Sequence, residues 1–569
     1  MNVRMEPDNA IVAKAHQWLA ARIDDETRKE IEHWLAHYPA ALTEAFYTDL
    51  DFGTGGMRGV MGAGSNRINR YTIGIATQGL AQYILAHATN GSVAIAHDSR
   101  RQSAVFARVA AEVLSANGIR VFLFDELRPT PLLSYTVRHL GCTAGIVITA
   151  SHNPPKYNGY KVYWNDGAQV VPPQDKGIIT EVRAVRGIED VKFNPDPQLI
   201  SGVPVEVEKT YREKVVALVH AREAIDKAND LRIVYTSIHG AGITLVPDVL
   251  AQAGFCNVSV VEAQAKPDGD FPTVVSPNPE EKAAMDLALA LAEKQLAHLV
   301  LGTDPDTDRV GIGVRNDRGE MVLLNGNQAG SLLVYYQLMQ RKRKGTLHEN
   351  AYVAKTIVTS ELIAAIAHDF GVECIDTLTG FKYIAEVMRQ RGPEFICGGE
   401  ESYGYLVGEF VRDKDGVISS LVFAEIAAWC MANGTTMWKM LCELYTRYGY
   451  YYDELYTRTM EGQQGLSQIN AMMENLRQHP PQSLGGSPVV KVADVSMGKS
   501  WSLQTGETSD LPLPSSNVLQ FFLEDGSKIS ARPSGTEPKI KFYFSLRSTN
   551  GDENVARERV QQIKSELGV

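Results

Sequence analysis

The sequence contains few cysteines and no long apolar run, and each absence excludes a class of protein. Only six cysteines occur among 569 residues, and none are spaced as CxxC, which excludes a disulfide scaffold and a zinc ribbon. The longest apolar-looking stretch, residues 283–292, contains an aspartate and is far shorter than the roughly 20 residues that cross a bilayer. The N-terminus lacks the pattern of a signal peptide. We therefore expect a cytoplasmic protein without a membrane partner.

The sequence also lacks an excess of basic residues. It has 56 Lys and Arg against 67 Asp and Glu, a formal net charge of −11. Because an acidic chain repels phosphate backbones, we expect no nucleic-acid partner, although a local basic pocket for a small anion remains compatible with this charge. The apolar fraction of 44% excludes disorder of the whole chain. At about 150 residues per domain, the length corresponds to roughly four domains.

Short aliphatic strands alternate with alanine-rich helices over most of the chain, as in the predicted strand 92–97, helix 103–118 and strand 121–124. This alternation is typical of α/β domains with largely parallel sheets, in which sites lie outside the carboxyl ends of the strands. The tail, in contrast, indicates an α+β domain. We predict a helical arm at 1–44 followed by four domains, at 45–215, 216–325, 326–457 and 458–569.

The loop TASHNPPKYNGYK, residues 149–161, follows an apolar strand and presents a serine on stiff backbone. Ser151 is followed by His152 and two prolines, which fix φ, and Lys161 supplies a cation. Ser151 is therefore a candidate nucleophile or phosphate carrier, which requires a nearby base or an electrophile already in place. An ordinary Ser/Asn/Pro turn is the alternative. The loop is not a GxSxG elbow, which disfavours an ester hydrolase.

Three alternating carboxylates, Asp304, Asp306 and Asp308, follow the apolar strand 298–303. Three carboxylates this close would repel one another without a cation, and hard oxygen ligands suit Mg²⁺. A calcium EF-hand is excluded because Arg309 and Arg315 occupy the positions of its glycine and glutamate. A further ligand is needed for octahedral Mg²⁺, and we expect a phosphate oxygen. A plain acidic loop is the alternative.

The segment GGEESYGYLVGEFVRDKDG, residues 398–416, combines a carboxylate and a hydroxyl. On an extended segment, Glu400 and Ser402 would point the same way and suit adjacent sugar hydroxyls. A charged turn is the alternative, and the charged run 412–415 is typical of surface charge. Upstream, Lys382 follows a glycine turn.

Two further loops offer donors for phosphate. Residues 530–544 place Arg532, Ser534, Gly535 and Thr536 within five positions, the inventory of a phosphate nest with a fork-shaped donor. The loop is not a Walker A motif, and a Pro-Ser-Gly turn is the alternative. The loop GTGGMRG, residues 53–59, places Arg58 on flexible backbone, where it would cap a substrate phosphate or belong to a plain flexible loop.

In combination these loops resemble the α-D-phosphohexomutase superfamily of phosphoglucomutases and phosphomannomutases. The resemblance covers roughly residues 45–550 and is carried, in order, by GTGGMRG, TASHNP, PDGDFP, SPNPE, DPDTDR, TGFKY, GEESYGY and RPSGTEPK. It implies three similar α/β domains with mixed, largely parallel sheets and a smaller C-terminal α+β domain around a central cleft. The GEES loop is most similar to that of phosphoglucomutases.

The resemblance also implies the role of each candidate residue. Ser151 would become a phosphoserine and would bind Mg²⁺ together with the three aspartates. Charge stabilisation and proton movement would fall to Arg58, His152, Lys161 and Lys382. Substrate binding would fall to Arg309, Thr379, Gly380, Glu400, Ser402, Lys414, Arg532, Ser534, Gly535, Thr536 and Lys541.

The implied activity is the Mg²⁺-dependent interconversion of glucose 1-phosphate and glucose 6-phosphate through glucose 1,6-bisphosphate, which is also the activator. Phosphomannomutase, phosphopentomutase and glucose 1,6-bisphosphate synthase remain alternatives within the superfamily. A phosphatase and a non-catalytic sugar-phosphate sensor remain alternatives outside it, although a sensor is disfavoured because the serine and the three carboxylates are all present. The expected partners are small sugar phosphates, bound by a monomer or dimer.

Overall fold

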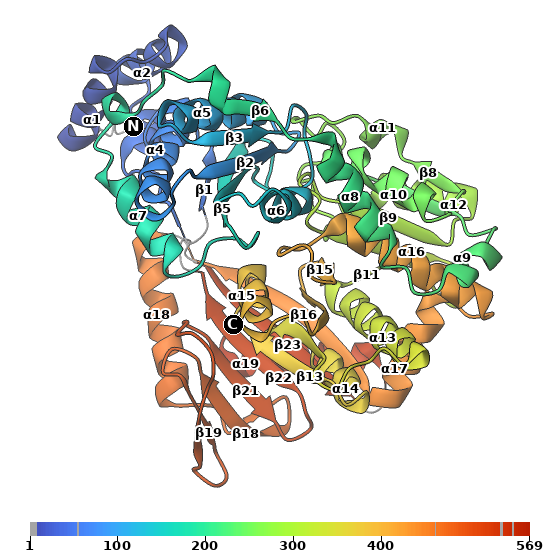
Figure 1. Cartoon of the computed structure of the whole chain (residues 1–569). Helices are drawn as coiled ribbons and strands as arrows, with labels where there is room; N and C mark the ends of the chain where they lie inside the picture. Colours follow the sequence, from blue (N-terminus) through green and yellow to red (C-terminus); the bar gives the residue numbers. More distant parts are fainter. Residues whose placement is uncertain (1–7, 54–55, 461, 535–538, 549–550) are drawn as a thin grey trace. The chain divides into compact units, whose positions relative to one another are not determined.

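The computed structural model describes residues 8–53, 56–460, 462–534, 539–548 and 551–569. Figure 1 shows the helices and strands of the chain, coloured along the sequence. Within the described ranges the chain forms two compact units. The first contains the described residues up to Gly326, Phe381–Cys397 and Ser402–Thr436. The second contains Asn327–Gly380, Gly398–Glu401 and the described residues after Thr436.

The N-terminal arm is helical, as predicted. Helix α2 begins where the Asp24 side chain accepts a hydrogen bond from the Thr27 amide at 2.8 Å. The apolar faces of the arm pack onto the first domain through Trp18, which contacts Phe46 and Tyr71 edge to face. The arm helices are α1 (Asn9–Ala20), α2 (Asp25–His37) and α3 (Pro39–Phe46).

The first α/β domain contains a six-stranded mixed sheet in the order β1-β5-β4-β2-β3-β6. Strand β2 pairs in parallel with β3 on one side and β4 on the other, whereas β5 runs antiparallel to β4 and β1. The strands are β1 (Gly56–Val60), β2 (Ser92–His97), β3 (Arg120–Leu123), β4 (Ala144–Ile148), β5 (Tyr157–Trp164) and β6 (Ile200–Gly202). The helices are α4 (Arg70–His87), α5 (Ser103–Ala116), α6 (Thr130–His139) and α7 (Gln174–Ala184).

The second α/β domain contains a five-stranded mixed sheet in the order β11-β10-β9-β7-β8. Its core strand β7 is parallel to β8 and β9, and β9 returns antiparallel into β10. The strands are β7 (Ile233–Thr236), β8 (Val258–Val260), β9 (Leu299–Thr303), β10 (Val310–Arg315) and β11 (Met321–Leu324). The helices are α8 (Val205–Val216), α9 (Arg222–Lys227), α10 (Val246–Gln252), α11 (Glu262–Ala265) and α12 (Lys282–Gln295).

The third α/β segment also alternates strands and helices, and β12 pairs in parallel with β13. Its strands are β12 (Tyr352–Thr356), β13 (Glu373–Thr377), β14 (Phe395–Glu400) and β15 (Gly404–Val407). Its helices are α13 (Gly326–Lys344), α14 (Glu361–Asp369), α15 (Phe381–Arg391), α16 (Gly416–Ala432) and α17 (Met437–Tyr448). In the described part of the chain, no single helix is long and apolar enough to span a membrane, and α16 and α17 meet the length and composition criteria only as a bent pair.

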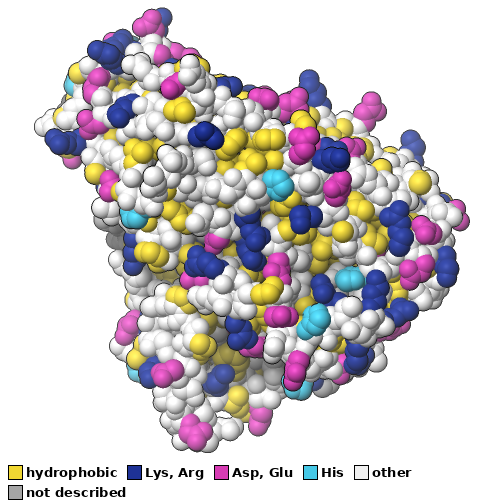
Figure 2. All heavy atoms as spheres, in the orientation of Figure 1, with side chains coloured by type: hydrophobic (Ala, Val, Ile, Leu, Met, Phe, Trp, Pro, Cys, Tyr) yellow, Lys and Arg dark blue, Asp and Glu magenta, His cyan; other side chains and the backbone are white. Residues whose placement is uncertain are grey.

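The C-terminal domain is α+β, as predicted, and its sheet runs β16-β23-β22-β21-β18-β19-β20, with β17 paired to β18. Every pairing in it is antiparallel. Its strands are β16 (Tyr450–Thr459), β17 (Ser483–Leu484), β18 (Ser487–Asp494), β19 (Lys499–Ser502), β20 (Thr508–Asp510), β21 (Leu519–Leu523), β22 (Lys528–Pro533) and β23 (Lys539–Ser548). Its helices are α18 (Gly462–Gln478) and α19 (Glu553–Leu567). On the face drawn in Figure 2, acidic and basic side chains are interspersed.

Candidate active site

The topology of the first sheet places a site where strand order reverses. The chain leaves β2 for β3 on one side and then crosses back to β4 on the other. In open α/β sheets, ligands bind at this kind of switch point, outside the carboxyl ends of the strands. The segment after β2 begins with Asp98, and the loop after β4 carries Ser151. Two segments about 50 residues apart along the chain therefore meet.

Ser151 is buried, and its backbone has the left-handed conformation, with φ of +52°. Its hydroxyl donates a hydrogen bond to Asp304 Oδ2 at 2.8 Å and lies 3.2 Å from His152 Nδ1. Its backbone N–H donates to Thr149 Oγ1 at 2.8 Å. The structure thus brings the predicted phosphate carrier directly against the predicted metal loop.

The three metal-loop aspartates are buried between β9 and β10, and each offers an oxygen within 4.8 Å of the others. The backbone N–H groups of Asp308 and Arg309 both donate to Asp304 Oδ1 at 3.1 Å. Asp306 Oδ1 and Asp308 Oδ1 accept no hydrogen bond from the residues that the structure describes. Carboxylate oxygens that accept no hydrogen bond and converge in a buried site fit a hard divalent cation such as Mg²⁺.

Two lysines neutralise part of this acidic cluster. Lys161 Nζ lies 2.7 Å from Asp306 Oδ2 and 3.2 Å from Asp308 Oδ2. Lys414 Nζ lies 3.2 Å from Asp308 Oδ2. Burial acts to raise the pKa of each carboxyl, but at Asp306 the charge of Lys161 and the hydrogen bonds with Asp304 and Lys161 outweigh burial and lower the pKa. For Asp304 the neighbouring carboxylates raise the pKa further, whereas for Asp308 the charges of Lys414 and Lys161 outweigh burial and lower the pKa. The cluster therefore contains carboxylates of unequal proton affinity.

Lys414 belongs to the run 412–415, and the expectation that this run is surface charge is wrong. Asp413 and Asp415 are buried. Tyr163 donates its hydroxyl to Asp413 Oδ2 at 2.7 Å, and Tyr211 donates to Asp415 Oδ2 at 2.8 Å. Buried tyrosines therefore satisfy two carboxylates of the run and fix Lys414 beside the metal loop.

Three more predicted residues surround the serine loop. Arg58 donates from Nη1 to Asn153 Oδ1 at 3.2 Å, and Arg309 forms an ion pair with Glu280. Burial lowers the pKa of His152 to about 2, and the charges of Arg309 and Arg58 act in the same direction. The imidazole is therefore neutral near pH 7.

Lys382 stands at the start of α15. Burial lowers the pKa of its ammonium group, although the charges of Asp175 and Glu386 oppose this shift.

The second unit contains other predicted substrate residues. Glu400, the last residue of β14, accepts a hydrogen bond from the backbone N–H of Gly380 at 2.9 Å, next to Thr379. Arg532 of β22 lies directly opposite Lys541 of β23. Burial raises the pKa of the Tyr543 hydroxyl, the charge of Arg532 opposes this rise, and the charge of Glu400 adds to it. Within this unit, a carboxylate suited to hydroxyls therefore lies near a guanidinium suited to phosphate.

The remaining predictions have different outcomes. Residues 401–403 form a turn, and Tyr403 has a φ of +66°. The expected extended segment through Ser402 is therefore wrong, since the strand ends at Glu400. The backbone N–H of Ser534 donates to the Lys539 carbonyl oxygen at 2.7 Å. The predictions for Gly535 and Thr536 lie outside the described residues.

The sequence did not predict several residues that contact Asp306 and the Ser151 loop and hold them in place. Thr130, at the start of α6, donates from Oγ1 to Asp306 Oδ2 at 3.1 Å, and its backbone N–H donates to the Asp306 carbonyl oxygen at 2.9 Å. Asp98 and Arg100 contact the loop of Ser151. The available signal was position, because the sequence DSR directly follows strand β2 and PTP stands at the start of helix α6.

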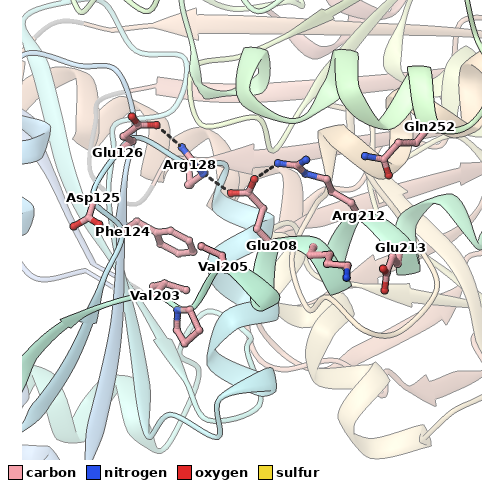
Figure 3. Close-up of a pocket in the computed structure, with 12 residues that line it drawn as sticks. Phe124, Asp125, Glu126, Arg128, Val203, Val205, Glu208, Arg212, Glu213 and Gln252 are labelled. Carbon is pink, nitrogen blue, oxygen red and sulfur yellow. Dashed lines mark hydrogen bonds and ion pairs between the residues drawn. The ribbon is translucent and has the colours of Figure 1, made fainter.

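A separate cavity of about 620 Å³ lies in the first unit, beside the end of β3 and the start of α8 (Figure 3). Glu208 lies between two cations there: Arg128 Nε at 2.6 Å and the guanidinium of Arg212. Two arginines that line the cavity are therefore already paired with an internal carboxylate. This pairing makes the cavity a poor site for a sugar phosphate. Arg128 nearly adjoins Thr130, so this network supports the segment that holds Asp306.

Comparisons with known proteins match the chain along most of its length. Family models of phosphoglucomutase/phosphomannomutase alpha/beta/alpha domains I, II and III match residues 49–187, 209–319 and 325–448. A phosphoglucomutase of Staphylococcus epidermidis is 38% identical over 509 residues, which cover 88% of this chain and 92% of that protein. A phosphoglucomutase of Staphylococcus aureus is 38% identical over 515 residues, which cover 90% and 92%.

The fold is also similar to that of solved structures. The open form of a Paramecium phosphoglucomutase aligns with a TM-score of 0.68 at 18% identity, and the alignment covers 92% of this chain and 94% of that one. At this level of identity the alignment carries information about the fold alone. It agrees with the mixed α/β domains and the additional β-rich C-terminal domain seen here.

Proposed function

Because this chain belongs to the phosphoglucomutase/phosphomannomutase family and is a mutase of the phosphohexomutase type, we propose that it interconverts glucose 1-phosphate and glucose 6-phosphate. The observation that carries the proposal is the hydrogen bond from the Ser151 hydroxyl to Asp304, at 2.8 Å, inside a buried cluster of three carboxylates. A serine oxygen held against a cation site can both carry a phosphoryl group and place its oxygens on the metal. The relatives named phosphoglucomutase favour glucose as the sugar.

In the proposed reaction, Ser151 carries phosphate before the sugar monophosphate binds. The free hydroxyl oxygen of the sugar attacks phosphorus, the bond between phosphorus and Ser151 Oγ breaks, and the sugar hydroxyl loses a proton while Ser151 Oγ gains one. Glucose 1,6-bisphosphate results. After it turns around, Ser151 Oγ takes the other phosphoryl group by the reverse exchange. No net oxidation occurs, and each turnover regenerates phospho-Ser151.

The residues of the first unit would stabilise this transfer electrostatically. Phosphoryl transfer depends on positioning and charge stabilisation more than on covalent chemistry. Lys161 and Lys414 supply ammonium groups beside the aspartates, and Arg58 lies next to the serine loop through Asn153. Asp304, Asp306 and Asp308, with an oxygen of phospho-Ser151, would hold Mg²⁺, which when bound supplies Lewis-acid stabilisation of the transferring oxygens.

The second unit would bind the parts of the sugar phosphate that do not react. Glu400 offers a carboxylate to sugar hydroxyls while Gly380 orients one of its oxygens. Arg532 and Lys541, opposite one another on β22 and β23, offer cations to the non-reacting phosphate. Because the two halves of the reaction present the sugar in opposite orientations, this set would have to accept both monophosphates. We include a cytoplasmic location in the proposal, because six cysteines in 569 residues, none spaced as CxxC, are too sparse for a disulfide scaffold.

The proposal is tested by comparing substrates. Purified protein with Mg²⁺ and a trace of glucose 1,6-bisphosphate should convert glucose 1-phosphate with a kcat/KM at least tenfold above that for mannose 1-phosphate or a pentose 1-phosphate. A preference for one of the other sugars would assign the chain to that activity instead. Release of inorganic phosphate without isomerisation would contradict the mutase mechanism, and accumulation of bisphosphate would indicate a synthase. Ser151→Ala should abolish this turnover, and Ser201→Ala, at an exposed serine of β6, is its matched control and should keep the activity of the parent.

A further inference from the structure

The geometry points to Arg100 as the positioning residue that holds the Ser151 loop in the conformation from which phosphate is transferred. The inference rests on the proposed role of Ser151 as the phosphate carrier. It adds a residue that contacts neither the three metal-loop aspartates nor the sugar-binding set and that acts through the backbone of the Ser151 loop.

The guanidinium of Arg100 donates hydrogen bonds to carbonyl groups of this loop. Its side chain is completely buried. Nη1 donates to the carbonyl oxygens of Pro154 at 3.0 Å and Tyr157 at 3.1 Å. Nη2 donates to the carbonyl oxygens of Ser151 and Asn153. One planar group therefore binds four carbonyls spread over seven residues of a single loop, which fixes the loop's curvature.

The partner of Arg100 holds the same serine from the amide side. Asp98 Oδ2 lies 3.3 Å from Arg100 Nε. It also accepts a hydrogen bond from Thr149 Oγ1 at 2.6 Å. Thr149 Oγ1 in turn accepts from the backbone N–H of Ser151 at 2.8 Å. The ion pair of Asp98 and Arg100 thus acts on both sides of Ser151, through its N–H and through its carbonyl.

The conformation of Ser151 explains why such support is needed. A non-glycine residue at φ of +52° occupies the left-handed region that L-residues disfavour. Strained residues of this kind persist only where the surroundings over-determine them. The φ of Ser151 also sets the direction of its Oγ toward Asp304. If the four carbonyl contacts were lost, the loop would relax and the hydroxyl would leave the carboxylate.

A second loop closes over the outer side of Arg100. The ring of Phe271 lies 5.0 Å from Arg100 Cζ and is fully buried. The backbone approaches so closely there that a Cβ on Gly269 would lie 2.3 Å from the Arg101 nitrogen. Phe271 itself has a positive φ of +47°. The domain that carries the metal loop therefore packs a fixed aromatic ring against the guanidinium.

Lysine cannot replace arginine in this arrangement. The guanidinium presents five N–H donors in a rigid plane, whereas an ammonium has three donors on a flexible stem. Arg100→Lys keeps the charge opposite Asp98 but loses the fork that binds the carbonyls. Arg101→Lys is a matched control, because Arg101 is the next residue, largely exposed, and pairs with Asp270.

The test combines hydrogen exchange with kinetics in the full-length protein. In Arg100→Lys, amide exchange in residues 149–160 should accelerate at least tenfold while exchange in the C-terminal sheet stays unchanged. The kcat should fall roughly ten- to hundredfold with KM within about threefold, because the loss acts on the transfer geometry rather than on sugar binding. Arg101→Lys should match the parent in both measurements.

Two results would overturn the inference. Unchanged exchange in 149–160 would show that Arg100 does not hold the loop. Faster exchange with an unchanged kcat would show that the contacts of Arg100 with the loop do not affect phosphoryl transfer. A parent protein without mutase activity would instead refute the proposed function, and the exchange measurement would still decide whether Arg100 fixes the loop. If Arg100→Lys failed to fold, Phe271→Leu should give the same pattern of effects with smaller size, and its absence would equally overturn the inference.

Discussion

The hydroxyl of Ser151 donates a hydrogen bond to Asp304 Oδ2 at 2.8 Å, although the two residues are 153 positions apart. Ser151 follows β4 of the first sheet, and Asp304 follows β9 of the second. Because each residue stands just beyond the carboxyl end of a strand, the contact joins the sites of two similar domains. It places a nucleophile and a cation site in one buried cluster.

The metal assignment predicts that Asp306→Asn weakens Mg²⁺ binding by at least tenfold. The substitution removes one of three converging negative charges and breaks the 2.7 Å ion pair with Lys161. Titration of the purified variant with Mg²⁺, followed by calorimetry, measures the affinity directly. Asp317→Asn, at an exposed aspartate beyond β10, controls for the general loss of a negative charge. A variant whose titration matches that of the parent would show that Asp306 is not a ligand.

The support of Lys414 predicts a measurable role for a tyrosine hydroxyl. Tyr163→Phe leaves the buried carboxylate of Asp413 without its 2.7 Å donor. Such a loss costs about 1–3 kcal/mol of unfolding free energy. Because Lys414 pairs with Asp413, its ammonium group should also be displaced, which should raise KM for the sugar phosphate severalfold. Tyr160→Phe, on the same strand but bonded to Thr77, should leave KM unchanged. Equal kinetics in the two variants would refute the positioning of Lys414 through Tyr163.

A buried ion cluster in the second unit predicts acid sensitivity. Lys355 is almost completely buried and contacts Asp376 Oδ1 at 2.7 Å and Glu361 Oε1 at 3.0 Å. Burial raises the pKa of Glu361, but the charges of Lys355 and Lys528 outweigh it and lower the pKa below its ordinary value of 4.5. Because the folded pKa is the lower one, this stabilisation is present above about pH 4.5 and is lost as pH falls.

Glu361→Gln should therefore destabilise the protein most at pH 7, and the difference from the parent should shrink between pH 5 and pH 3. Urea unfolding of both proteins across this range measures it. Glu349→Gln, at an exposed position, should show no such trend. A difference that stays constant with pH would mean that the ionisation of Glu361 does not contribute.

The sequence predicted the parts of the site that consist of side chains following strands. Ser151 and the three aspartates were identified because each stands in a short polar loop next to an apolar strand, and the structure brings them together. Lys161 was predicted at the end of the serine loop, but it lies within β5, from which it reaches Asp306. The alternation of strands and helices likewise predicted α/β domains and an α+β tail, which the structure shows.

Other features depend on partners that no local pattern reveals. Asp413 and Asp415 are buried because Tyr163 and Tyr211, more than 200 positions away, donate to them. Arg100 was missed because its partners are backbone carbonyls, which carry no residue signature. The turn after Glu400 depends on a positive φ at Tyr403, an uncommon conformation for a tyrosine.

The central claim is that Ser151 carries the phosphate that is transferred, and intact-mass measurement of the purified protein tests it most directly. After incubation with glucose 1,6-bisphosphate and Mg²⁺, one phosphate should be present, peptide mapping should place it on Ser151, and excess glucose 6-phosphate should remove it as bisphosphate appears. Ser151→Ala should never acquire it. A chain that gains no phosphate under these conditions, or gains it at another residue while still isomerising the sugar, would contradict the account.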